Sequence, residues 1–276
     1  MENKIGKLVL KNACPLNTAL TLDCGQSFRW YEKEGNIWHG IAYEKSIDVY
    51  MQGSDLVISG DVEDKDENLW REYFDLDTGY TEICEKLCAD KWLNKAVTAY
   101  PGIRILKQEP WEALCSFIIS QNNNIPRIKG IIDRLCTNFG KRLHGGEYSF
   151  PSAQVIAAQS VESLAPLRAG FRAKYIIDAA RKVSDGTVDL KRISEMPIEE
   201  ARTELQKISG VGPKVAECAL LYGFGRKEAF PVDVWVRRIM AELYPEGLPE
   251  CTCGVEGIAQ QYLFHWRRNV ENPFEK

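Results

Sequence analysis

The hydrophobic pattern of this chain changes its period once, near residue 66. Residues 26–60 alternate apolar and polar positions around polar turns at 33–36 and 52–55, a pattern typical of an antiparallel β-meander. Beyond residue 66 the apolar residues recur at helical spacing. Two helical stripes are clear: one consists of Trp111, Leu114, Cys115 and Ile118, and the other of Ile128, Ile131, Ile132, Leu135, Cys136 and Phe139, with Gly140 as its expected C-cap. We therefore expect an α+β fold, with a small N-terminal antiparallel sheet domain over residues 1–100 and a mostly α-helical body over residues 101–276.

The length and composition are those of a globular protein. The chain has 276 residues, of which 45% are hydrophobic, and this is enough to bury the core of one or two domains. It contains no apolar run of membrane-spanning length, and its first residues resemble neither a signal nor a transit peptide. We expect an intracellular protein with no membrane partner, a monomer, and cytoplasmic at the nucleoid if the source is prokaryotic.

Charge is unevenly distributed along the chain. The formal net charge is −4 at pH 7, but residues 1–100 carry 11 basic and 18 acidic side chains, whereas residues 101–276 carry 24 and 21. The net charge is therefore −7 for residues 1–100 and +3 for residues 101–276. Any surface that binds a polyanion is expected in the second part.

The nine cysteines are dispersed, and several fall on apolar helical faces, which favours reduced, structural thiols. Cys84 and Cys88 are one helical turn apart, and Cys251 and Cys253 form one close pair. Neither pair belongs to the four-cysteine array that an iron–sulfur cluster requires. We therefore predict no such cluster and no cofactor for catalysis.

The segment over residues 205–216 predicts two helices joined by a tight turn. Gly210 and Gly212 permit backbone conformations with positive φ and leave amide N–H groups uncovered, and Pro213 suits the first position of the next helix. A turn of this kind can bind a phosphate. Lys214 falls in the first turn of that helix, where the macrodipole disfavours a further positive charge and so favours the neutral, nucleophilic amine.

A carboxylate follows this lysine. Asp233 directly precedes a second helical pattern and is well placed as its N-cap. Taken singly, these residues also fit a plain connection between helices, with a solvated Lys214 and an Asp233 that only caps. Their combination is more specific, because it resembles the helix-hairpin-helix and Gly/Pro-Asp signature of base-excision DNA glycosylases. In that superfamily lysine marks the bifunctional members, which also cut the strand. The resemblance thus implies that Lys214 is the Schiff-base nucleophile and Asp233 the catalytic aspartate.

Four further segments resemble one family within this superfamily, the 8-oxoguanine DNA glycosylases. They occur in the expected order and span nearly the whole chain. They are the lesion-contact motif at residues 25–30 (GQSFRW), the asparagine loop at 120–127 (SQNNNIPR), the intercalating loop at 169–175 (AGFRAKY) and the base pocket at 259–264 (AQQYLF).

The resemblance assigns several residues to a base pocket. A base stacked in a duplex hides the sugar carbon to be attacked, so the nucleotide must flip out. The carbonyl oxygen of Gly25 would accept the N7–H that 8-oxoguanine carries and guanine lacks. Phe264 and the sulfur of Cys218 would sandwich the flipped base, with Gln260 on its pairing edge. In another protein, Phe264 and Cys218 would be interpreted as ordinary core residues.

Other matched residues would contact the DNA around the lesion. Asn122 would fill the vacated stack, and Phe171, which stands where eukaryotic members have a tyrosine, would wedge beside the base left behind. Asn122, Arg127 and Arg172 would surround the cytosine opposite the lesion. A polar connector or a set of phosphate contacts is the plainer interpretation of the same residues.

The hairpin would bind the DNA backbone through Gly210 and Gly212. Trp235, in place of a histidine, would lie near a phosphate. Three backbone carbonyls match those that hold a structural cation, a monovalent ion or calcium, in family hairpins: those of Gln206, Ile208 and Val211.

The sequence thus predicts a bifunctional DNA glycosylase/AP lyase of base excision repair. It would excise 8-oxoguanine, preferably opposite cytosine, from damaged double-stranded DNA and cleave the strand by β-elimination. Two alternatives stay open. One is a glycosylase for other damaged bases, and the other is a non-catalytic DNA-binding protein that uses the hairpin only for phosphate. The latter would have no need of Lys214 and Asp233 together.

Overall fold

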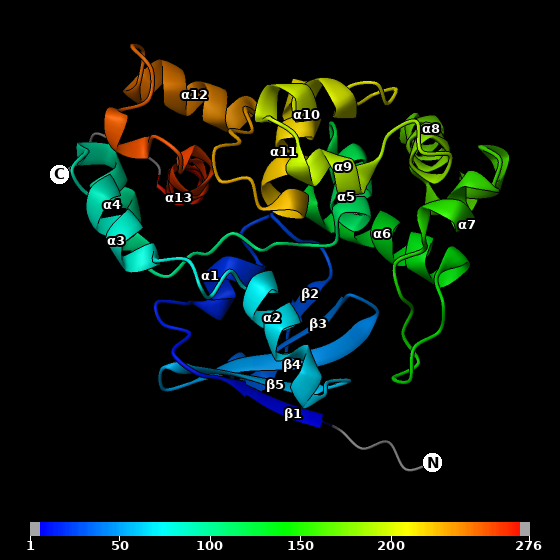
Figure 1. The fold of residues 1–276 in the computed structure, drawn as a ribbon, viewed down its shortest axis with the longest axis horizontal. Helices are drawn as coiled ribbons and strands as arrows, with labels where there is room; N and C mark the ends of the chain where they lie inside the picture. The colour runs from blue at the N-terminus through cyan, green and yellow to red at the C-terminus, as the bar shows by residue number, and fades with distance from the viewer. Residues whose placement is uncertain (1–5, 271–276) are drawn as a thin grey trace.

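The computed structural model describes residues 6–270 as a small antiparallel sheet with a helical body above it (Figure 1). The sheet has the strand order β1-β5-β4-β3-β2. Its strands are β1 (Gly6–Leu10), β2 (Trp30–Glu32), β3 (Trp38–Ala42), β4 (Lys45–Gln52) and β5 (Asp55–Gly60). The predicted meander is confirmed as β2 to β5. The prediction omitted β1, whose five residues carry little local signal and which forms an edge only by pairing with β5.

Two short helices lie between the sheet and the helical body: α1 (Thr18–Leu22) and α2 (Glu67–Tyr73). Trp30 of β2 donates from its indole N–H to the hydroxyl oxygen of Tyr73 across 2.8 Å. The same ring covers its cross-strand neighbour Gly40, where a Cβ atom would lie 2.2 Å from it. The glycine therefore lets a fully buried tryptophan lie flat against the sheet and dock α2.

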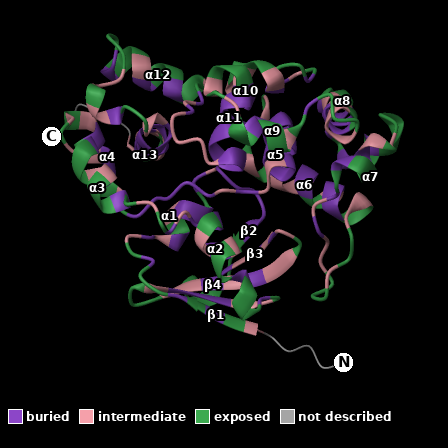
Figure 2. Ribbon diagram, viewed as in Figure 1, coloured by how far each residue is buried: buried purple, intermediate pink, exposed green. Residues whose placement is uncertain are grey.

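The helical body is assembled around two buried helices, α5 (Pro110–Ser120) and α11 (Pro213–Phe224). Figure 2 shows their buried residues in purple at the centre of the body. Around them lie α3 (Tyr80–Leu87), α4 (Lys91–Ala99), α6 (Ile125–Phe139), α7 (Ala153–Ala157), α8 (Arg172–Ser184), α9 (Leu190–Glu195), α10 (Ile198–Leu205), α12 (Val234–Leu243) and α13 (Glu256–Asn269). Both predicted stripes lie on the buried faces of α5 and α6.

The helix ends follow the local signals. Asn124 caps α6, because its side-chain oxygen accepts from the amide of Arg127 at 3.0 Å. Gly140 is the C-cap as predicted, although its φ is −78°. It is needed for close approach instead, because a Cβ atom there would lie 2.1 Å from the carbonyl oxygen of Ser149.

The buried apolar residues form two cores. One joins the sheet to α2, and the other fills the helical body. Residues from α3 and α4 pack into the helical core, as does Phe28, whereas Leu106 packs into the sheet core. The domain boundary at residue 100 stays a prediction.

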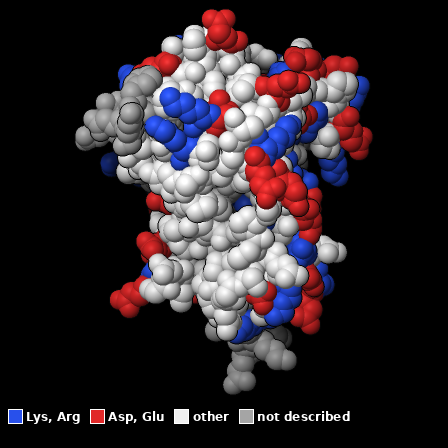
Figure 3. Space-filling model, turned by 90° about the vertical axis from the view of Figure 1, so that its left-hand side faces the viewer, with Lys and Arg blue, Asp and Glu red and all other residues white. Residues whose placement is uncertain are grey.

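Figure 3 shows the side of the molecule on the left of Figure 1. Basic and acidic side chains of the described residues are interspersed there around a broad uncharged area, and these residues form no continuous basic surface on this side. Over residues 6–270, no helix is both long and apolar enough to cross a bilayer.

Candidate active site

Six residues that the sequence assigns to chemistry or base binding meet around one small cavity. It lies between the loop after α1, α11, the segment before α12, and α13. The six lining residues in question are Gly25, Lys214, Cys218, Asp233, Gln260 and Phe264. They come from positions spread over 240 residues of the chain, and the tertiary fold brings them together.

Lys214 is the second residue of α11, as predicted. Its Nζ atom donates to the hydroxyl oxygen of Ser120, at the end of α5, across 3.2 Å. The amine also lies 5.2 Å from the centre of the Phe117 ring. One hydroxyl and one aromatic face thus hold the amine at the cavity.

Asp233 caps α12, as predicted. Its Oδ1 atom accepts from the amide of Val236 at 2.8 Å. Among the described residues, the Lys214 amine pairs with the Ser120 hydroxyl rather than with the Asp233 carboxylate. The capping bond at the helix end therefore orients the carboxylate of Asp233, which lines the cavity.

Gly25 lies in a turn with φ of 89°, a conformation that favours glycine. The buried side chain of Gln26 holds this turn. Its Nε2 atom donates to the backbone carbonyl oxygens of Thr21 and Arg104, each at 2.8 Å. The Gln26 carbonyl oxygen accepts from the side chain of Gln108 at 2.7 Å. This network fixes the backbone next to Gly25, including the carbonyl assigned to base recognition.

Two buried thiols and the buried amide of Gln260 line the cavity. Burial raises the pKa of the Cys218 thiol, although the charge of nearby Lys214 opposes this, and burial raises the pKa of Cys24 to about 12. Gln260 is 4% exposed, and its Oε1 atom has no hydrogen-bond partner among the described residues. A buried amide oxygen without a partner is costly, so it is suited to accept a donor from a ligand.

The cavity has a volume of about 60 Å³. Two water molecules occupy about this volume in liquid water. A purine base is larger than this. Half-buried Phe264, whose ring lies 5.2 Å from the Arg268 guanidinium, borders the cavity. Entry of a base therefore requires movement of lining side chains.

The predicted hairpin joins α10 to α11. Gly210 has φ of 80°, and a Cβ atom there would lie 2.4 Å from the ring of Tyr175 on α8. Gly212 differs from the expectation, because its φ is −91° and open space surrounds it. As the N-cap of α11 it has no side-chain oxygen to cover the amides of the first turn, which leaves these amides for an anion.

The three carbonyls assigned to a cation fit such an ion. The oxygen of Ile208 accepts one hydrogen bond, from the amide of Val211 at 3.0 Å, and so keeps one lone pair. The carbonyl oxygens of Gln206 and Val211 accept none from the described residues. Across residues 6–270, no group of three Cys, His, Asp or Glu side chains is arranged to hold a metal. The predicted lack of an iron–sulfur cluster stays a prediction.

Residues assigned to the DNA around the lesion divide into exposed and buried ones. Asn122, at φ of 47°, and Arg127 are exposed, as are Phe171 at 48% and Trp235 at 37%. Phe171 also meets the ring of Tyr175 edge to face, at 6.0 Å between centres.

Arg172 differs from this expectation, because it is 2% exposed. Its guanidinium donates to the carbonyl oxygens of Gln121 at 2.8 Å, Asn122 at 2.9 Å and Ala169 at 3.1 Å. The arginine thus shapes the loop that carries Asn122, because four of its five N–H donors bind backbone carbonyl oxygens of the protein. Its assigned contact with cytosine stays a prediction.

The sequence analysis gave no role to Tyr222 and Gln261, which line the cavity, or to Ser120, which contacts Lys214. Tyr222 donates to the Gln261 side chain at 2.6 Å, and Gln261 donates to the carbonyl oxygen of Cys24 at 3.4 Å. Tyr222 lies eight residues after Lys214, so helical spacing places it on the same face, and this signal was available.

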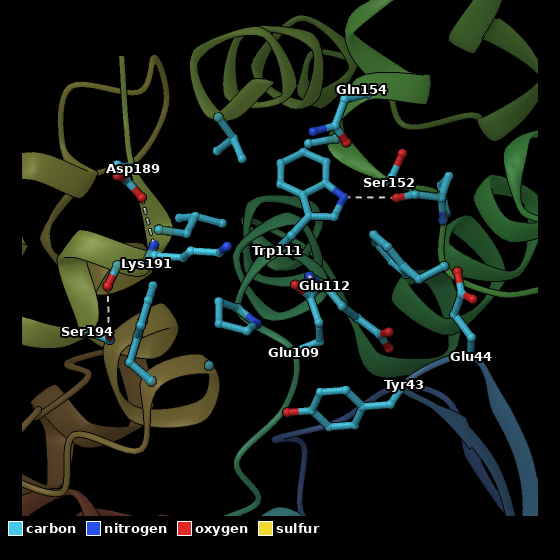
Figure 4. Close-up of a pocket in the computed structure, with 18 of the residues that line it drawn as sticks. Tyr43, Glu44, Glu109, Trp111, Glu112, Ser152, Gln154, Asp189, Lys191 and Ser194 are labelled. Atoms are coloured by element: carbon cyan, nitrogen blue, oxygen red, sulfur yellow. Dashed lines mark hydrogen bonds between the residues drawn. The ribbon is translucent and has the colours of Figure 1, made fainter. Parts of the chain in front are cut away.

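A much larger cavity, of about 990 Å³, lies elsewhere (Figure 4). It forms between Tyr43, the first turn of α5, α9 and the end of α11. Trp111 occupies its wall and donates to the carbonyl oxygen of Pro151 at 2.9 Å. The first turn of α5 lines this larger cavity, whereas its last residue, Ser120, contacts Lys214 at the smaller one. The two cavities therefore lie at opposite ends of α5. None of the predicted site residues lines the larger one.

A helix-hairpin-helix with a lysine in its second helix and a capping aspartate nineteen residues later defines the class: a DNA glycosylase fold. The model of the 8-oxoguanine DNA glycosylase N-terminal domain matches residues 8–114. The model of the HhH-GPD superfamily of base excision DNA repair proteins matches residues 115–247.

Known proteins agree with these matches. The chain is similar to an N-glycosylase/DNA lyase of Saccharomyces cerevisiae, with 35% identity over 88% of this chain and 72% of the relative. It is also similar to the apo structure of the Clostridium acetobutylicum 8-oxoguanine glycosylase/lyase, with a TM-score of 0.88, 38% identity and coverage of 96% and 98% of the two chains. The same enzyme with double-stranded DNA containing cytosine opposite 8-oxoguanine gives a TM-score of 0.86 at 36% identity, covering 97% and 99%. The chain belongs to the 8-oxoguanine DNA glycosylase family, as predicted.

Proposed function

We propose that Lys214 is the nucleophile with which this DNA glycosylase/lyase excises 8-oxoguanine in base excision repair. The observation that carries the proposal is the meeting of Lys214, Asp233 and the four assigned base contacts at one cavity. Among the nucleophilic groups that line it, the thiols of Cys24 and Cys218 and the phenol of Tyr222 all have pKa values raised by burial. The lysine amine is the better candidate, because thiols and phenols attack as anions.

The proposed reaction has two stages. The neutral amine of Lys214 attacks C1′, and the bond from C1′ to the base breaks, so the base departs with the electron pair and takes up a proton. The nitrogen then loses a proton and its lone pair forms an imine with C1′, while the bond from C1′ to O4′ breaks and O4′ leaves with the electron pair and takes up a proton. Loss of a proton from C2′ then expels the 3′ phosphate, and water releases the lysine. Asp233 stabilises the positive charge on the sugar during the first stage.

Preference for cytosine opposite the lesion belongs to the same proposal. Arg127 is exposed beside the Asn122 loop, and arginine donors suit the O2 and N3 acceptors of cytosine. The Clostridium acetobutylicum relative was solved with this base opposite 8-oxoguanine. A monomer is proposed as the acting species.

A cation at the carbonyls of Gln206, Ile208 and Val211 completes the proposed DNA grip. Carbonyl oxygens are ligands of hard cations, and such an ion would add positive charge beside the uncapped start of α11. In this proposal a DNA phosphate binds at the turn between α10 and α11, where Gly210 and Gly212 leave backbone amides uncovered.

Borohydride trapping on duplex DNA tests the proposal. The wild-type protein is expected to form a covalent complex with DNA carrying 8-oxoguanine opposite cytosine, because borohydride reduces the imine. Lys214→Gln should bind the same duplex with comparable affinity but neither excise nor trap, since the amine takes part in chemistry while affinity arises from phosphate and pocket contacts.

The remaining candidates predict other results. Excision by Lys214→Gln at a comparable rate would show that another group is the nucleophile. Efficient trapping on alkylated bases with none on 8-oxoguanine would favour a glycosylase for other damage.

A further inference from the structure

A buried carboxylate on α11 joins three segments of the site. Glu217 is 9% exposed and lies three residues after Lys214 and one before Cys218. Its Oε1 atom accepts from the Nε atom of Arg202 on α10, and its Oε2 atom accepts from the amide of Phe230 at 2.6 Å. Glu217 does not line the cavity, and none of the base or DNA contacts assigned above falls on it.

Phe230 begins the segment that carries Asp233. The next residue, Pro231, has no amide N–H and lines the base cavity together with Asp233. Within the described part of the chain, the bond to Glu217 is the one hydrogen bond formed by the backbone of residues 230–232. Glu217 is therefore the polar anchor that ties this segment to the helix of Lys214.

Arg202 provides the partner that a buried carboxylate needs. Its Nη2 atom lies 3.4 Å from the Oε2 atom of Glu217, and its other contact is the exposed Glu199. The guanidinium thus pairs with the carboxylate and holds it where its Oε2 atom accepts from the amide of Phe230. Because α10 and α11 are the two arms of the hairpin, the same pair also links the arms beneath the turn.

We propose that Glu217 is a positioning residue that sets the separation between the Lys214 amine and the Asp233 carboxylate. The inference rests on the roles proposed above for these two residues. A displacement of about 1 Å at reacting groups can lower a rate on the order of a hundredfold. Loss of the anchor therefore slows base excision, whereas DNA affinity stays, because Glu217 provides none of the assigned DNA contacts.

Two substitutions of Glu217 distinguish the effect of its hydrogen-bond acceptor from the effect of its side-chain volume. Glu217→Met keeps a similar length and removes both oxygens, and Glu217→Gln keeps an amide oxygen that can accept from Phe230. The measurements are single-turnover excision of 8-oxoguanine opposite cytosine at saturating enzyme, and affinity for a duplex with a tetrahydrofuran abasic analogue. Glu199→Ala is the control, because it removes the other partner of Arg202 and leaves the anchor intact.

We expect Glu217→Met to lower the excision rate by roughly tenfold or more while its affinity stays within about twofold of wild type. Glu217→Gln should recover the rate to within about threefold, and Glu199→Ala should match wild type. A role in folding alone would lower the melting temperature of Glu217→Met but leave the rate of the folded protein unchanged. Rates of Glu217→Met equal to wild type, or no recovery in Glu217→Gln, overturn the proposal.

A double variant covers the case in which Glu217→Met does not fold. Arg202→Met with Glu217→Met removes the unpaired charge as well, and apolar replacement of a buried ion pair is often tolerated. It should show the same rate loss, and a wild-type rate would overturn the proposal. Failure of the wild-type protein to trap on DNA would instead contradict the proposed function. Trapping by wild type, with equal rates in the variants, contradicts only the positioning role.

Discussion

The Nζ atom of Lys214 donates a hydrogen bond to the Oγ atom of Ser120 across 3.2 Å, which couples the amine on α11 to the last residue of α5. The Ser120 hydroxyl itself donates to the carbonyl oxygen of Phe117 at 2.8 Å. With its proton engaged there, its lone pairs are free to face the amine. The helix that precedes the Asn122 loop therefore also orients the proposed nucleophile.

Ser120→Ala should lower the rate of base excision by roughly two- to tenfold. A hydrogen bond of this kind contributes about 0.5–1.5 kcal/mol, and the amine is less well oriented without it. Single-turnover excision and borohydride trapping measure the effect. Ser194→Ala is the control, because its hydroxyl makes a comparable bond to the carbonyl oxygen of Lys191 away from the site. Equal rates in the two variants would show that Ser120 does not orient the amine.

Gly25→Ala should reduce lesion affinity or the discrimination between 8-oxoguanine and guanine. Space is available, since the nearest atom to a Cβ would be Cδ1 of Ile125 at 3.6 Å, but φ of 89° is unfavourable for alanine, so the recognising carbonyl shifts. Gly35→Ala is a matched control, with φ of 76° and open space. Binding and cleavage of both duplexes should change only in the first variant. If Gly35→Ala changed binding and cleavage as much as Gly25→Ala, the effect would come from backbone strain and not from recognition of the lesion.

The two arginines near the Asn122 loop should behave differently. Arg127→Ala is expected to relax the preference for cytosine by about tenfold, because a base contact provides about 1–3 kcal/mol of discrimination. Arg172→Ala should slow excision opposite all four bases alike, because its guanidinium holds the carbonyl oxygens of Gln121 and Asn122. Excision rates opposite each base measure both effects. A uniform loss in Arg127→Ala would identify it as a phosphate contact instead.

Glu112 should make the stability depend on pH. Burial raises its pKa from 4.5 to about 7, although Arg29, whose guanidinium lies 3.7 Å away, opposes the shift. Between these values the unfolded chain releases the proton and the folded protein keeps it, so the stabilisation is complete below pH 4.5 and lost as the pH rises to 7. The free energy of unfolding should fall by about 2–3 kcal/mol more in wild type than in Glu112→Gln between pH 5 and 8. Denaturant titrations measure this, and parallel pH profiles would contradict it.

Local sequence signals determined much of the fold and the chemistry. The alternation over residues 26–60, the stripes of α5 and α6, and the capping positions of Asn124 and Asp233 all depend on spacing within one or two turns. The glycine turn followed by Lys214 and Asp233 indicated the superfamily, and the four local segments at 25–30, 120–127, 169–175 and 259–264 indicated the family. Such patterns are readable because their physical cause acts between near neighbours in the chain.

Only the tertiary structure decided which distant groups meet. Strand β1 pairs with β5, Arg172 is buried against the loop of Gln121 rather than presented to solvent, and Ser120 holds Lys214 from 94 residues away. The carboxylate of Glu217 bonds to Phe230 because a loop returns there. A side chain's type and periodicity limit what it can do, but its partner depends on how the helices pack, and that packing is a property of the whole core.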